Sequence, residues 1–146
     1  MNQRAIEKTE LNKILFLAAE YAVTEGGKAR LQETAPTPNV LDVRKRLKLT
    51  EEGVKALFTY GISKIEYFPP FLDEIDRAKK GSALTCGELL KTENLLRSTR
   101  IAHKSIVALE DEEIQDLKTL ANQLYFDEAL EEDIRTKILN DSEVSD

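Results

Sequence analysis

The stretch from Ala83 to Leu109 constrains the fold of this chain more than any other part of it. Thr85 and Glu88 stand in the capping-box arrangement, in which the hydroxyl and the carboxylate each accept a backbone N–H at a helix start. After Gly87 the stretch contains neither glycine nor proline, so no residue interrupts a helix before Leu109. The sequence therefore predicts one long helix here.

Apolar and small side chains recur along this predicted helix at alternating spacings of three and four residues. Such spacing gives the helix a narrow seam that packs against other helices. The seam consists of Leu89, Thr92, Leu96, Thr99, His103 and Ile106, and Leu95, Ala102 and Leu109 widen it. We therefore expect partner helices along this face.

Basic side chains lie mostly off the seam. The row consists of Lys79, Lys80, Lys91, Arg97, Arg100 and Lys104. Cations in such a row can contact phosphates, with an affinity that falls steeply as salt rises. No aromatic residue is interleaved among them to stack on bases, so contacts would be independent of sequence. This row is the candidate nucleic-acid-binding site, and an ordinary solvated helix face is the alternative.

Helical spacing of apolar residues continues through the rest of the chain. It predicts helices from about Thr9 to Val23, from Thr24 to Glu33 with a bend near Gly26 and Gly27, from Val40 to Tyr60 with Gly61 just beyond the end, from Asp73 to Lys80, from Ile114 to Leu124, and from Leu130 to Ile138 with Asp127 as the cap. Residues 67–71 (YFPPF) read as a loop, and residues 140–146 as a polar tail. The fold class is all-α, an irregular bundle of five to seven helices in a single domain over residues 1–146.

Charge is distributed unevenly along the 146 residues, whose net charge is −6. Residues 1–109 hold 18 Lys and Arg against 14 Asp and Glu, whereas residues 110–146 hold 3 against 13. This polarity indicates either a basic nucleic-acid surface beside an acidic end, or a solvated bundle whose last helices are acidic. The first nine residues lack a secretory apolar region, no run is long enough to span a membrane, and there is one cysteine. We therefore expect a cytoplasmic protein with no membrane partner.

No group of residues composes a catalytic or metal site. Gly26, Gly27 and Lys28 fail the Walker pattern on both sides. His103 is the only histidine and has no cysteine or histidine partner at metal-ligand spacing. Cys86 stands in the first turn of the long helix, where we expect it to fill space. The prediction is a chain with no catalytic residue, no metal ligand and no cofactor of its own.

Several short motifs, taken in order, resemble the N-terminus of the second bacterial MutS paralogue family, the branch that carries a C-terminal Smr nuclease domain. They are residues 9–15 (TELNKIL), 20–22 (EYA) with Gly27 and Lys28, 50–52 (TEE), 80–84 (KGSAL) with 88–90 (ELL), and 138–146 (ILNDSEVSD). Asn12 and Ser142 depart from the residues usual in the family. The resemblance spans nearly the whole chain.

The resemblance implies that the chain is the first half of a MutS-type helical core domain, with residues 140–146 leading toward the lever that follows in the family. For a complete family member it implies a homodimer, ATP and Mg as cofactors, ATP-driven binding to branched DNA with suppression of homologous recombination, an endonuclease activity and, in some bacteria, splitting of collided ribosomes. It places no catalytic residue within residues 1–146. The implied role of the chain is structural coupling between an ATPase and a clamp around DNA or the ribosome.

Half of a core domain should leave apolar stripes without partners. We therefore expect weak self-association through the face formed by Leu89, Leu95, Leu96 and Ala102. The alternative function is a free-standing helical adaptor that binds a partner helix in a groove beside the loop at residues 67–71.

Overall fold

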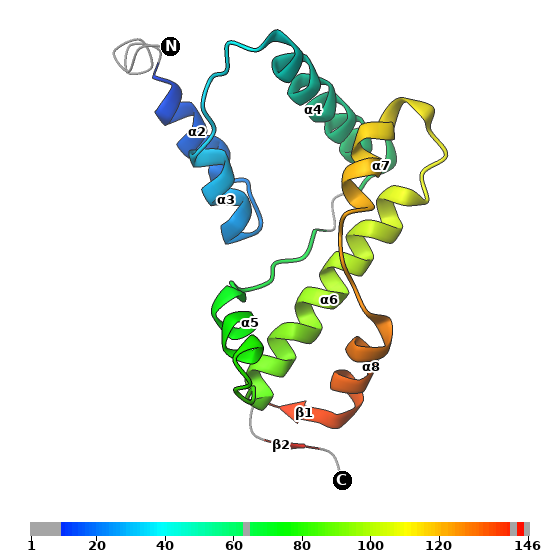
Figure 1. Ribbon diagram of the computed structural model, residues 1–146. Coiled ribbons are helices and arrows are strands. Elements are labelled where there is room, and N and C mark those ends of the chain that lie inside the picture. The colour runs from blue at the N-terminus through cyan, green and yellow to red at the C-terminus, as the bar shows by residue number, and fades with distance from the viewer. Residues whose placement is uncertain (1–9, 63–64, 141–142, 145–146) are drawn as a thin grey trace.

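The computed structural model describes residues 10–62, 65–140 and 143–144. These residues form seven α-helices, one short 3₁₀ helix and one pair of short antiparallel strands (Figure 1). The elements are α2 (Leu11–Ala19), α3 (Glu25–Gln32), α4 (Val40–Tyr60), α5 (Leu72–Lys79), α6 (Cys86–Val107), η1 (Glu112–Ile114), α7 (Gln115–Ala121), α8 (Glu128–Lys137), β1 (Ile138–Asn140) and β2 (Glu143–Val144). The predicted all-α class is confirmed.

The long helix predicted after the capping box is α6. The backbone N–H of Glu88 donates to Thr85 Oγ1 at 3.3 Å, and the backbone N–H of Thr85 donates to Glu88 Oε2 at 2.8 Å. Both contacts satisfy donors that would otherwise have no partner at a helix start. Helix α6 runs for 22 residues from this cap.

Two other helix boundaries follow their sequence signals. Helix α4 covers Val40–Tyr60 as predicted, and Gly61 ends it with φ of 66°, a left-handed conformation that glycine adopts without a Cβ clash. Asp127 caps α8, because its carboxylate accepts the backbone N–H of Leu130 at 3.0 Å.

The N-terminal pair of helices differs from prediction in detail. Helix α2 covers only Leu11–Ala19, and its predicted start at Thr9 lies outside the described residues. Helix α3 begins after Thr24, whose hydroxyl accepts the backbone N–H of Gly27 at 3.1 Å. The two glycines at 26 and 27 therefore lie inside the first turn of α3, and the predicted bend at these glycines is wrong. The chain turns before Thr24 instead.

Both C-terminal helices end earlier than predicted. Helix α7 stops at Ala121, and the side chain of Leu124 beyond it is 36% exposed. Helix α8 stops at Lys137, where Ile138 turns to an extended backbone and is only 8% exposed. Part of the predicted polar tail is therefore a strand, in which Ile138 pairs with Val144 and Asn140 with Glu143.

Helix α6 is the centre of the packing. Helix α8 lies along it, and α7 and β1 also contact it, whereas α4 lies against η1 and α7 (Figure 1). Helices α2 and α3 pack side by side on each other at a separate corner of the molecule. The buried apolar side chains of the larger part are Ala56, Leu96, Ile114, Ala121, Ile134 and Ile138. This core is small for a chain of 146 residues.

The apolar face that we expected to be exposed on α6 is covered. Leu96 is 5% exposed, and Leu89, Leu95 and Ala102 are half-buried, because α6 is the helix on which α7, α8 and β1 pack. This face is therefore largely used within the fold, and self-association stays a prediction. The large exposed apolar side chains lie mainly on α2 and α4, where Phe16 is 58% and Leu47 58% exposed.

None of the helices formed by the described residues has both the length and the apolar content needed to cross a membrane.

Candidate nucleic-acid interface

The six basic residues of the predicted row lie on α5 and α6, and the structure places four of them beside carboxylates. The pairs are Lys91 with Glu74 (3.1 Å), Arg97 with Glu93 (3.3 Å) and Glu66 (3.4 Å), Arg100 with Glu131 (2.5 Å), and Lys104 with Glu128 (2.7 Å). Each carboxylate offsets a positive charge that would otherwise face a phosphate. The row is therefore less basic than its sequence suggests.

Arg100 and Glu131 form the most enclosed of these pairs. The guanidinium donates from Nε to Glu131 Oε2 at 2.7 Å and from Nη2 to Oε1 at 2.5 Å, and the Glu131 side chain is 9% exposed. Two parallel bonds of this kind fix the orientation of both groups. The hydrogen bonds raise the pKa of Arg100 and lower the pKa of Glu131. The pair fastens α8 to the middle of α6.

A second ion pair fastens the same two helices. Lys104 lies one turn after Arg100 on α6, and its partner Glu128 lies one turn before Glu131 on α8. Arg97, one turn before Arg100, contacts Glu66 in the segment that precedes α5. The basic residues of α6 thus act largely as ties between elements.

Helix α5 is held to the start of α6 in the same manner. Lys91 pairs with Glu74, and Arg77 pairs with Glu88. The pKa of Glu74 is lowered, first by its own backbone N–H and then by Lys91. The pKa of Glu88 is lowered by the backbone N–H of Thr85 and then by Arg77. The first turn of α6 is therefore already occupied by its own carboxylate and offers no open site for an anion.

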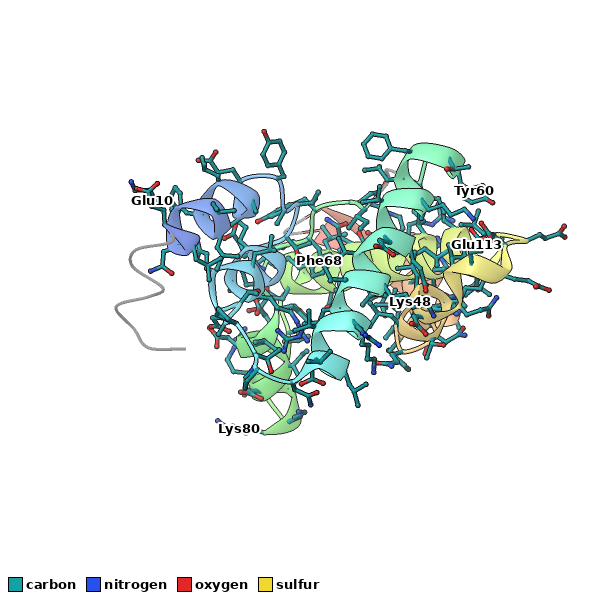
Figure 2. All side chains as sticks on the ribbon, turned by 90° about the horizontal axis from the view of Figure 1, so that it is seen from above. Glu10, Lys48, Tyr60, Phe68, Lys80 and Glu113 are labelled. Carbon is teal, nitrogen blue, oxygen red and sulfur yellow. The ribbon has the colours of Figure 1, made fainter. Side chains whose placement is uncertain are left out.

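Lys79 and Lys80 are the exception in the row. Both are exposed at the end of α5, and neither pairs with a carboxylate in the part of the chain that the structure describes. Figure 2 shows Lys80 at the outer edge of the molecule. The positive charges of Lys79 and Lys80, at one end of the row, are therefore not offset by a carboxylate of the described chain.

Three further cations lie on α4, outside the predicted site. Arg44, Lys45 and Arg46 are exposed and form no ion pair among the described residues. They could have been identified from the sequence as a basic cluster, because the three residues are consecutive. Successive residues of a helix are about 100° apart, however, so the three cannot face one phosphate group together.

Glu52 holds α4 to α7 and carries no signal in the sequence. Its side chain is 3% exposed, and its Oε2 accepts the backbone N–H of Leu117 at 2.7 Å. Leu117 is in the first turn of α7, which has no capping side chain of its own. Lys48 lies 3.5 Å from the other Glu52 oxygen and 3.0 Å from Asp116. A side chain from α4 therefore caps a helix that lies 65 residues further along the chain.

A second cluster ties α4 to η1. Lys55 Nζ lies 2.6 Å from Asp111 Oδ2 and 2.5 Å from Glu113 Oε2, and the Tyr60 hydroxyl donates to Asp111 Oδ2 at 2.7 Å. Lys48, Tyr60 and Glu113 lie along this junction in Figure 2. The Lys55 ammonium, followed by the backbone N–H of Glu113 and by Tyr60, lowers the pKa of Asp111 to about 2. Both carboxylates raise the pKa of Lys55.

His103 links α6 to the end of α7. Its Nε2 lies 3.2 Å from Asn122 Oδ1, and its ring lies 5.0 Å from the ring of Phe126 at a tilt of 51°. Within the described residues, no three His, Cys, Asp or Glu side chains are arranged to hold a metal ion. His103 is therefore a packing and hydrogen-bonding residue at this junction.

Over its whole length, the chain is similar to clostridial proteins named Endonuclease MutS2. It is 33% identical over 147 residues to the protein of Clostridium beijerinckii (strain ATCC 51743 / NCIMB 8052). It is 33% identical over 148 residues to that of Clostridium botulinum (strain Alaska E43 / Type E3), and 32% identical over 147 residues to that of C. botulinum (strain 657 / Type Ba4).

Each of these alignments covers 100% of this chain but 19% of the relative, so the chain spans about a fifth of the length of the curated relatives it matches. No family model matches the chain, and no solved structure matches it. The matched part of the relatives is their N-terminal part. The whole chain therefore corresponds to the N-terminal region of MutS2-family proteins.

Proposed function

We propose that this chain is a non-catalytic coupling module of a MutS2-type protein. In this proposal the helices transmit movement between an ATPase and a nucleic-acid clamp located elsewhere in a longer polypeptide. The relatives are named as endonucleases, which supports nucleic acid as the polymer on which a complete protein acts.

One observation carries the proposal, a continuous series of polar ties that joins four helices. Glu52 and Lys55 tie α4 to α7 and η1, and the contact between His103 and Asn122 ties α7 to α6. The pair of Arg100 and Glu131 then ties α6 to α8. Because such bonds require a specific geometry, we expect a displacement of α4 to be passed along this series to α8.

For the complete protein, we propose ATP- and Mg-dependent binding of branched DNA by a homodimer in the cytoplasm, with suppression of homologous recombination. Splitting of collided ribosomes is the alternative activity of the same machine. Both activities place turnover in parts of the complete protein other than residues 1–146.

The experiment has two arms. The purified chain is first assayed for hydrolysis of ATP and cleavage of branched DNA, and we expect neither. Spin labels are then placed on two exposed residues, Lys45 of α4 and Lys137 of α8, and the distance between them is measured by pulsed electron resonance. We expect one narrow distance distribution that broadens in Arg100→Gln. Hydrolysis by the chain, or a broad distribution in the unmodified chain, would contradict the proposal.

Nucleic-acid binding through the basic row stays a prediction of this proposal. The unpaired Lys79 and Lys80 should contribute more than the tied Arg100, because a tied guanidinium must first give up its carboxylate. In filter binding with branched DNA at low salt, Lys79→Glu/Lys80→Glu should weaken affinity several-fold. An unchanged affinity in this double variant would remove the row as an interface.

A second candidate function rests on one surface pocket. A hollow of about 520 Å³ lies between the loop at residues 67–71 and the first half of α6. It is lined by Pro69, Thr85, Gly87, Glu88, Leu90, Lys91 and Asn94. This is the place at which an adaptor would receive a partner segment. This candidate would be favoured if the chain alone bound partner proteins without the rest of a MutS2 protein, and if Leu90→Glu abolished that binding.

A further inference from the structure

The hairpin formed by α2 and α3 has no polar tie to the rest of the molecule. Among the described residues, no hydrogen bond or ion pair joins residues 10–34 to residues beyond them, and Lys13 and Lys28 pair with Glu10 and Glu25 of the hairpin itself. The two helices pack extensively only on each other. The hairpin can therefore turn as one body without breaking a polar contact of the described chain.

A short linker, residues 34–38 (TAPTP), connects the hairpin to α4 and is largely exposed. Pro36 and Pro38 fix their own φ angles and restrict the residue before each of them. The linker itself is therefore stiff, and turning takes place at its two ends. Because five residues span at most about 18 Å, the hairpin stays close to the N-terminal half of α4 in every orientation.

The hairpin carries an apolar stripe that no described element covers. It consists of Ile14, Leu17 and Tyr21, which follow one another at helical spacings of three and four residues and are 57% to 88% exposed. Tyr21 lies in the turn after α2, where its backbone N–H still donates to the Ala18 oxygen at 3.1 Å. Ala19, the buried residue of α2, lies roughly opposite this stripe on the helix.

Helix α4 carries a second uncovered stripe, whose members are spaced three, four or seven residues apart. They are Val40, Val43, Leu47, Val54 and Phe58, and they are 38% to 79% exposed. The covered positions of α4, Glu52 and Ala56, lie roughly opposite this stripe at about 100° per residue. Those positions belong to the side of α4 that packs against η1 and α7.

The arrangement of the elements turns the α4 stripe toward the hairpin. Figure 1 and Figure 2 both show α4 between the α2–α3 hairpin on one side and α7 on the other. Because the covered side of α4 is the one against η1 and α7, the uncovered side is the one nearer the hairpin. Two apolar stripes of one chain are thus placed on neighbouring elements that a short linker joins.

We propose that the hairpin is a strap that closes on α4, with the stripe of α2 packed along the stripe of α4. Closure removes apolar area of both helices from water. The linker selects this occupant over a free partner, because a surface tethered so closely has an effective concentration on the order of millimolar. The structure holds the open arrangement. In the closed one, a partner helix reaches the α4 stripe only by displacing the hairpin.

Distances between spin labels test the closure. The labels are placed in a Cys86→Ser background at Glu20→Cys and Lys45→Cys, two exposed positions outside both stripes. Pulsed electron resonance should give the distance of the open arrangement together with a second, shorter one. Leu17→Glu or Leu47→Glu should lower the ratio of short to long distances about tenfold, because a charge replaces an apolar side chain in the contact.

The matched control is Leu41→Glu, which changes the same residue type on the same helix. Leu41 lies away from the α4 stripe and is 74% exposed. This variant should keep both distances in their original ratio. Far-UV circular dichroism of each variant establishes that its helix content is kept.

Chemical crosslinking identifies the occupant without a charged substitution. In the Cys86→Ser background, a short bismaleimide should join Leu17→Cys to Leu47→Cys within one chain, and should join Leu17→Cys to Leu41→Cys far more slowly. The products are separated by mass, so crosslinks within a chain are distinguished from crosslinks between chains.

Three results would overturn the proposal. The first is a single Glu20–Lys45 distance equal to that of the open arrangement. The second is a short distance that survives both Leu17→Glu and Leu47→Glu. The third is crosslinking of Leu17→Cys to Leu47→Cys only between chains, which would make a second copy the occupant of the α4 stripe. If either glutamate variant does not fold, the crosslinks decide the question.

Discussion

At the scale of single residues, the contacts between helices combine a small apolar core with polar side-chain ties. Ile114 is the one large side chain among the described residues that is completely buried. The contacts between helices instead contain paired charges, of which Arg100 with Glu131 is the most enclosed. A mostly buried charge that loses its partner is only partly rehydrated by water, so such a pair is costly to break singly.

Replacing Arg100 by Gln should therefore destabilise the chain by about 2 kcal/mol, since Glu131 is left with one weaker donor at most. Urea denaturation followed by circular dichroism measures this. Arg135→Gln is the matched control, because Arg135 forms the same two-pronged contact with Glu132 on the surface of α8, where both side chains are more than half exposed. The control should leave the midpoint unchanged. Equal loss in both variants would contradict a special role for the α6–α8 pair.

Acid should weaken the junction between α4 and η1. The pKa of Asp111 is lowered from 3.8 to about 2, chiefly by Lys55. A carboxylate with a depressed pKa in the folded state stabilises that state above its unfolded pKa, and this contribution is lost as the pH falls from 3.8 toward 2. The urea midpoint of Asp111→Asn should therefore depend less on pH in this window than that of the unmodified chain. Asp76→Asn, at an exposed position without an ion pair in the described chain, is the control and should not flatten the profile.

At the scale of elements, two glycines of α4 should respond in opposite directions to alanine. Gly53 is inside the helix, and an added Cβ there would meet nothing within 4 Å, so Gly53→Ala should stabilise the chain by about 0.5–1 kcal/mol. Gly61 has φ of 66°, so Gly61→Ala should destabilise it by about 1 kcal/mol. Thermal melts of the two variants check both signs. A Gly61→Ala variant as stable as the unmodified chain would show that α4 does not end as described.

Element boundaries were predictable from sequence where a local contact sets them. Thr85 with Glu88, Gly61 and Asp127 all act within their own turn of chain, and the helices they delimit have the predicted limits or nearly so. Boundaries set by distant contacts were not predictable. Ile138 leaves the helical pattern because burial beside α6 is available to an extended backbone.

The candidate site shows the same limit more strongly. The basic residues could be located on their helix from spacing alone, but their partners Glu128 and Glu131 come from another helix, which sequence spacing does not bring near. The capping of α7 by Glu52 could not be predicted from the sequence either, because Glu52 and Leu117 are 65 residues apart. Local sequence therefore predicts on which helix a charged side chain lies, but not whether a carboxylate from another helix pairs with it.

At the scale of the whole molecule, the helices form a linked series with one large exposed apolar stripe. Helices α4, α7, α6 and α8 are joined by side-chain ties, whereas α2 and α3 pack on each other. Few apolar side chains are fully buried and many large ones are exposed, so the fold depends on its polar junctions more than a compact domain of this length would.

The four tied helices should behave as one body, and native-state hydrogen exchange tests this most directly. The slowest amides of α4, α6, α7 and α8 should open with one common free energy, and Arg100→Gln should lower that free energy in all four helices while leaving α2 and α3 unchanged. A variant that loses protection in α8 alone, with α4 and α7 unaffected, would contradict the claim.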